Sequence, residues 1–99
     1  MAKRKMIWSS RAKLDLLRLL DYYYQRNGSK TYSRKLNDNF RKATQLIIQY
    51  PYIGKKTDIP NVRVLITGNY AMFYKIFETD IELLALWDTR QNPSKIDIR

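Results

Sequence analysis

The sequence predicts an α+β fold in which a helical hairpin packs on one face of an antiparallel sheet, in the element order β-α-α-β-β-β. Three observations support this prediction: apolar residues at helical spacing in the first half of the chain, β-branched residues at alternating spacing after residue 61, and a hairpin turn at Gly68-Asn69. The chain has 99 residues and no linker-like stretch. We therefore expect one domain that spans residues 1–99.

The first two elements are expected to be a short strand and a helix. Residues 3–8 form the strand, because they end in the apolar run Met6-Ile7-Trp8. A helix over residues 11–25 follows, since Ser9-Ser10 offers a hydroxyl that can accept a bond from a free amide of the first turn. Its apolar stripe consists of Leu16, Leu20 and Tyr23, with Leu17 and Tyr24 beside it. Asn27-Gly28 ends the helix, because glycine tolerates the left-handed conformation of a helix terminus.

The second helix has the most regular pattern in the sequence. Its apolar positions are Tyr32, Leu36, Phe40, Ala43, Ile47 and Tyr50, spaced by three or four residues. Ser29 offers a capping hydroxyl at the start, and Pro51 stops the helix after about 20 residues, or about 30 Å. Because the linker between the helices is short, they should form an antiparallel hairpin.

A loop over residues 52–61 separates the helices from three strands. We expect these strands at residues 62–67, 70–77 and 81–87, joined by tight turns. The last strand is apolar on both faces, so it should lie inside the sheet and not at its edge. A polar tail over residues 88–99 should extend beyond the sheet or fray.

The charge balance points to an anionic partner. The chain carries 19 Lys and Arg against 9 Asp and Glu, a formal net charge of +10. Such a charge suits nucleic acid or an acidic protein segment, and charge alone does not choose between them.

Several site chemistries are excluded or disfavoured by composition. Without histidine, the chain lacks the side chain best suited to proton transfer near neutral pH. Without cysteine, it can form neither disulfides nor thiolate metal sites. Its carboxylates are not spaced as a metal site, so we expect no metal and no cofactor. The sequence shows no signal-peptide pattern and no membrane-spanning run, so a cytoplasmic protein without membrane contact is expected.

A set of short motifs runs in order along nearly the whole chain. It comprises Trp8-Ser9, Ala12, Asp15-Leu16, Tyr22-Tyr23, Arg26-Asn27, Pro51 with Gly54, Arg63, Tyr70 with Phe73 and Tyr74, and Asp88 with Arg90 and Pro93. In this ordered set the chain resembles the RelE/ParE superfamily, the toxin halves of bacterial type II toxin–antitoxin pairs. The resemblance implies a growth-inhibiting toxin whose partner is an acidic antitoxin encoded by the adjacent gene.

The resemblance also implies one of two targets. ParE-like members are known as DNA gyrase poisons, whereas RelE-like members cut messenger RNA in the ribosomal A site with Lys, Arg and a C-terminal Tyr or His. This chain has no His, no Tyr after Tyr74, and Ile66 where the RelE-like strand carries an Arg four residues before the conserved Tyr. We therefore favour a gyrase-binding poison that is not an enzyme. The alternatives are a ribosome-dependent, metal-independent endoribonuclease and a non-toxic small RNA-binding module.

Four basic residues are the candidates for binding the target: Lys55, Lys56, Arg63 and Arg90. The two lysines lie in a loop, where binding residues concentrate. The arginines can bind carboxylate or phosphate through a planar fork, although Arg90 could instead pair with Asp88. In a nuclease the same four cations would stabilise the developing phosphorane, and no general acid or base is identified.

Antitoxin binding is assigned to a second group of residues: Lys3, Arg4, Lys5 and Tyr22. The N-terminal cations offer electrostatic contact to an acidic partner. Successive residues of a helix point about 100° apart, so at least one of the three tyrosines at positions 22–24 must be exposed, and an exposed tyrosine suits an interface.

Overall fold

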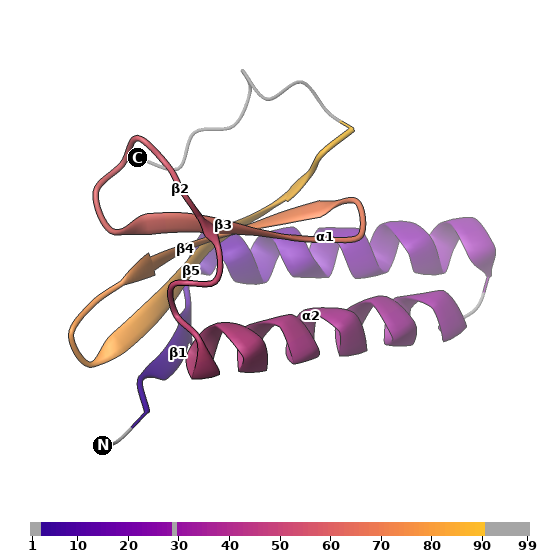
Figure 1. The fold of residues 1–99 in the computed structure, drawn as a ribbon. Helices are drawn as coiled ribbons and strands as arrows, with labels where there is room; N and C mark the ends of the chain where they lie inside the picture. Colours follow the sequence, from indigo (N-terminus) through magenta and orange to yellow (C-terminus); the bar gives the residue numbers. More distant parts are fainter. Residues whose placement is uncertain (1–2, 29, 91–99) are drawn as a thin grey trace.

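The computed structural model describes residues 3–28 and 30–90. Its elements, in chain order, are β1 (Lys5–Trp8), α1 (Ser10–Asn27), α2 (Thr31–Gln49), β2 (Lys55–Lys56), β3 (Val62–Thr67), β4 (Tyr70–Ile76) and β5 (Asp80–Asp88). The two helices form a hairpin that covers one face of the sheet (Figure 1). This confirms the α+β fold, and the short strand β2 is an addition to the expected order of elements. Within the described residues, neither helix is long and apolar enough to cross a membrane.

The sheet has five strands in the order β1-β5-β4-β3-β2. The meander β3-β4-β5 is antiparallel throughout, as expected. The first strand, β1, joins it in parallel beside β5, so the sheet as a whole is mixed. This places β5 between β1 and β4 and confirms its interior position. The two-residue strand β2 lies in the segment expected to be a loop, where Lys55 pairs with Val64 and Lys56 with Arg63.

The ends of α1 follow the capping signals in the sequence. Ser9 is the N-cap, and its hydroxyl accepts a bond from the Ala12 amide at 3.0 Å. Gly28 ends the helix with a φ of 68°, in the left-handed region that favours glycine. At the start of α2 the N-cap is Lys30, which makes no side-chain capping bond. Ser29, the expected cap, lies outside the described residues.

The core lies between the helical hairpin and the sheet. Its largest fully buried side chains are Phe40 and Ile47 from α2, Met72 and Tyr74 from β4, and Ile81 and Leu83 from β5. The middle of the apolar stripe on α2 is buried as predicted, whereas Tyr32 and Tyr50, at its two ends, are exposed. The helix therefore buries its central turns and leaves a tyrosine uncovered at each end.

Tyr74 connects this core to the segment that follows α2. Its hydroxyl donates to the Pro51 carbonyl oxygen at 2.7 Å and accepts from the Gly54 amide at 2.9 Å. A Cβ at Gly54 would lie 2.7 Å from that hydroxyl and 2.8 Å from the Val64 carbonyl oxygen, so only glycine fits this close approach. Burial raises the pKa of Tyr74, which keeps its hydroxyl protonated and able to donate. Residues 51–54 are thereby fixed against β3 and β4.

Candidate functional site

The residues assigned to target and antitoxin binding gather mainly around two pockets at opposite ends of the meander. The first, which we call the β3–β4 pocket, lies where β3 begins and β4 ends. The second, the α1–β5 pocket, lies where β5 ends, beside α1. Because Tyr70 pairs with Asp88 and Ile76 with Ile81, the two pockets are separated by the length of β4.

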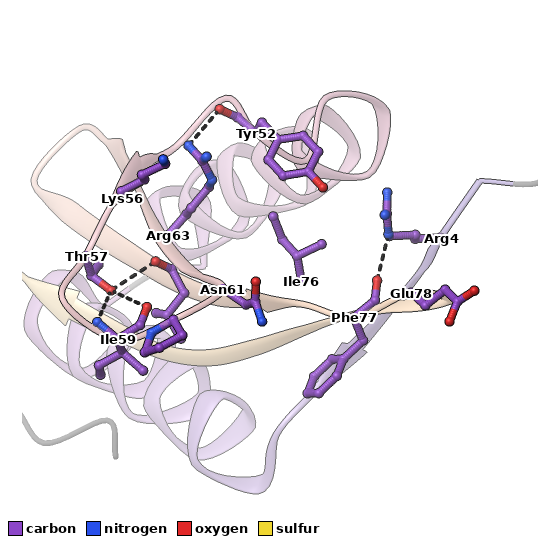
Figure 2. Close-up of a pocket in the computed structure, with 12 residues that line it drawn as sticks. Arg4, Tyr52, Lys56, Thr57, Ile59, Asn61, Arg63, Ile76, Phe77 and Glu78 are labelled. Carbon is purple, nitrogen blue, oxygen red and sulfur yellow. Dashed lines mark hydrogen bonds between the residues drawn. The ribbon is translucent and has the colours of Figure 1, made fainter.

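The β3–β4 pocket has a volume of about 790 Å³. The side chains at its rim include Arg4, Tyr52, Lys56, Arg63, Phe77 and Glu78 (Figure 2). These residues come from segments far apart in the chain, so only the folded protein assembles them. Among the described residues, its lining combines three cations with exposed aromatic rings and one carboxylate.

Arg63 is held in this pocket by uncharged partners. Its Nη1 donates to the carbonyl oxygens of Gly54, at 2.7 Å, and of Tyr52, at 3.2 Å. Its guanidinium carbon lies 5.0 Å from the centroid of the Tyr52 ring. Since Tyr74 fixes the Gly54 segment, the position of Arg63 depends in turn on the core. None of these partners carries a negative charge, so the charge of Arg63 is not neutralised by them.

Arg4 and Lys56 bring further positive charge to the same rim. The Nε of Arg4 donates to the Phe77 carbonyl oxygen at 2.7 Å. Lys56 stands directly opposite Arg63 across the β2–β3 pair, so both side chains leave the sheet on the same side. Lys55, the preceding residue, must point to the other side, and it is not among the described residues that line the pocket. The two lysines assigned to target binding therefore point to opposite sides of the sheet.

The α1–β5 pocket has a volume of about 560 Å³ and holds Arg90. Arg90 forms a bidentate ion pair with Asp88, with Nε 2.9 Å from Oδ1 and Nη2 2.8 Å from Oδ2. The bonds from Arg90 hold the pKa of the Asp88 carboxyl below its ordinary range, and the carboxylate raises the pKa of the guanidinium in return. The alternative noted for Arg90, an ion pair with Asp88, is thus present.

Two tyrosines tie Arg90 to the core. Its Nη2 lies 3.3 Å from the Tyr23 hydroxyl, to which Tyr70 donates at 3.0 Å. The bond from Tyr70, and then the bond from Arg90, lower the pKa of Tyr23. Burial raises the pKa of Tyr70, so Tyr70 stays protonated and remains the donor. Arg90 is therefore exposed and yet positioned by both α1 and β4.

The residues assigned to the antitoxin divide between these pockets. Arg4 shares the β3–β4 pocket with Lys56 and Arg63, and Tyr22 shares the α1–β5 pocket with Arg90. Lys3 precedes β1 and Lys5 begins it, and both are exposed. The two groups of residues defined from the sequence therefore do not form two separate surfaces.

Sequence reasoning missed several pocket residues. Arg18 and Arg26 flank Tyr22 at intervals of four on α1, and all three line the α1–β5 pocket. That spacing could have found them, because residues four apart share one helix face. Tyr52 and Phe77 carried no comparable signal, since their place in the β3–β4 pocket depends on contacts distant in sequence. Among residues 3–28 and 30–90, no group of three or more His, Cys, Asp or Glu could hold a metal ion.

Comparison with known proteins relates this arrangement to a toxin family. A family model described as "ParE toxin of type II toxin-antitoxin system, parDE" matches residues 6–93. A solved structure titled "Chromosomal ParDE TA system from P. aeruginosa" is similar with a TM-score of 0.74 and 18% sequence identity, covering 87% of this chain and 96% of that chain. At this identity the structural likeness shows the fold alone. No curated protein matches the chain.

Proposed function

The chain belongs to the ParE toxin family of type II toxin–antitoxin systems, and from that premise we propose that it arrests growth by poisoning DNA gyrase. Its mode of action is binding and not RNA cleavage. The observation that carries this proposal is the separation of the four cations that a nuclease mechanism would need together. Arg90 lies in the α1–β5 pocket, and Lys56 and Arg63 lie in the β3–β4 pocket. Lys55 points to the opposite side of the sheet from Lys56 and Arg63.

The nuclease alternative is weakened further by charge. Stabilising a phosphorane requires cations aimed at the same few oxygens in a site that excludes water. Arg90 is paired with Asp88 through two bonds, which neutralises the cation of the C-terminal motif. At position 66 of β3 the side chain is an exposed isoleucine and not an arginine. These features suit a surface that binds a large partner better than a catalytic centre.

The target contact in this proposal centres on Arg63 and Lys56, with Arg90 as a second contact. Arg63 is held rigidly and is not ion-paired with any of its partners, so it loses little conformational freedom when it binds an anionic group. DNA gyrase and the alternative target, the ribosome, are both cytoplasmic, so we place the toxin in the cytoplasm.

The antitoxin partner is expected to be acidic and to neutralise the toxin by covering the same pockets. Arg4 and Tyr22, two residues assigned to the antitoxin, each share a pocket with a residue assigned to the target. An acidic segment that folds onto the toxin could therefore block target contacts directly, without changing the toxin's conformation.

Expression in a bacterium tests this proposal. Cells that express the chain should stop growing and accumulate gyrase-linked DNA breaks, and co-expression of the adjacent gene should restore growth. Primer extension on translated messages should show no new cuts at A-site codons. A-site cuts without DNA breaks would assign the toxin to the nuclease branch. Normal growth with soluble toxin present would contradict both gyrase poisoning and RNA cleavage.

A further inference from the structure

We propose that the β3–β4 pocket binds a segment of single-stranded nucleic acid. In this arrangement a base stacks on the ring of Tyr52, and the neighbouring phosphates contact Arg63, Lys56 and Arg4. The proposal concerns a binding activity of the toxin itself and does not depend on gyrase being the cellular target.

The pocket contains an exposed aromatic ring, that of Tyr52. Tyr52 is 63% exposed, although its main chain is fixed by the bond from Arg63 to its carbonyl oxygen. In the view of Figure 2 its ring lies between the guanidinium groups of Arg63 and Arg4, above Ile76. Proteins bind single strands by stacking bases on such rings beside cations that follow the phosphate backbone. The pocket volume of about 790 Å³ falls within the range of small-ligand sites, about 300–1,000 Å³.

Positive charge is in excess around that ring, since three cations and one carboxylate line the pocket. Lys56 and Arg63 stand directly opposite each other on neighbouring strands, an arrangement of like charges that destabilises a sheet. The side chains of Arg63 and Arg4 bond to carbonyl oxygens, and Arg63 also lies over a ring; none of these partners is negatively charged. A bound phosphate would relieve this repulsion. In the α1–β5 pocket, by contrast, Arg90 already has a carboxylate partner.

An exposed ring beside several cations favours single-stranded nucleic acid over the other anionic ligands. A duplex presents phosphates, but its base faces are stacked inside and cannot reach Tyr52. An acidic peptide presents carboxylates, but it does not place a planar ring at a fixed distance from each charge. A single strand presents both phosphates and accessible base faces, and the net charge of +10 attracts it.

Fluorescence anisotropy with labelled oligonucleotides tests the proposal. The probes are dT12, rU12 and a dA12·dT12 duplex, with poly-L-glutamate as a competitor, and the protein is the full chain. Tyr52→Ala should weaken binding of the single strands by about 5- to 150-fold, the range expected for loss of one stacked base. The matched control is Tyr50→Ala, because Tyr50 is 55% exposed and is not among the residues that line the pocket. Its dissociation constant should stay within about twofold of wild type.

A second matched pair of variants, each of which removes one positive charge, keeps the test decisive if Tyr52→Ala fails to fold. Lys56→Gln should reduce the slope of log K against log salt by about 0.7, the value for one lost phosphate contact on a single strand. Lys42→Gln removes the same charge from the exposed face of α2 and should leave the slope nearly unchanged. Equal effects within either matched pair would overturn the proposal. So would binding of the duplex as tightly as the single strands, competition by poly-L-glutamate at equal charge concentration, or no binding at all.

Discussion

The guanidinium of Arg90 faces the carboxylate of Asp88 across two bonds of 2.9 and 2.8 Å, and its Nη2 also reaches the Tyr23 hydroxyl at 3.3 Å. The arginine is exposed, so water screens the pair and its contribution to stability is small. The consequence of the pair is positional, because it holds a long, flexible side chain against the end of α1. It also means that Arg90 must leave Asp88, or share it, to contact a target.

The ion pair predicts a shifted titration of Asp88. The bonds from Arg90 lower the pKa of the Asp88 carboxyl in the folded state. A lowered pKa means that the pair stabilises the fold at neutral pH, and that this stabilisation is lost as the pH falls below about 3.9 through the folded-state pKa. An NMR titration should show Asp88 titrating below its ordinary range in the wild type and returning toward that range in Arg90→Ala. An unshifted Asp88 in both proteins would contradict this geometry.

Removing Arg90 should separate function from folding. Arg90→Ala deletes an exposed side chain, so the melting temperature should stay within a few degrees of the wild-type value. Growth arrest should be weaker, since Arg90 is one of the proposed target contacts. Toxicity would be compared at equal soluble protein levels. A fully toxic variant would remove Arg90 from the target contact, and an unfolded variant would show that the Arg90–Tyr23 contact is structural.

The Tyr74 hydroxyl should be important for stability. Tyr74→Phe leaves the Gly54 amide and the Pro51 carbonyl without their partner in a buried place, which costs about 1–3 kcal/mol. For a domain of this size, that loss lowers the melting temperature by roughly 5–20 °C. Tyr50→Phe, at an exposed position, should change it by little. Equal melting temperatures for the two variants would show that the loop after α2 is not held by this hydroxyl.

The fold was largely predictable because its signals are local. The apolar spacing on α2 identifies both the helix and its buried face, and Ser9 and Gly28 mark the ends of α1 through bonds to near neighbours. The apolar character of β5 predicts its interior position. By contrast, β2 is two residues long and leaves no periodic signal, and nothing within residues 3–8 reveals that β1 pairs in parallel with β5.

The site was less predictable because it depends on distant contacts. Arg63, Lys56 and Arg90 were identified as cations at motif positions, but the sequence does not show that the first two share a pocket and the third lies at the other end of β4. Tyr52 was assigned only to a loop. Its exposure beside Arg63 follows from the bonds that Tyr74 makes to Gly54 and Pro51, residues 20 and 23 positions away in the sequence.

Purified toxin, DNA gyrase and supercoiled plasmid provide the most direct test of gyrase poisoning. With the wild-type toxin we expect linear plasmid to accumulate after denaturation and protease treatment. Arg63→Gln should require about 10- to 100-fold more toxin, the loss expected for one charged hydrogen-bonded contact, whereas Arg41→Gln, on the exposed face of α2, should behave as wild type. Melting curves of both variants would exclude unfolding as the cause. Linear plasmid that depends on Arg63 is the predicted result; unaffected gyrase, together with A-site cleavage in a translating extract, would contradict the proposal.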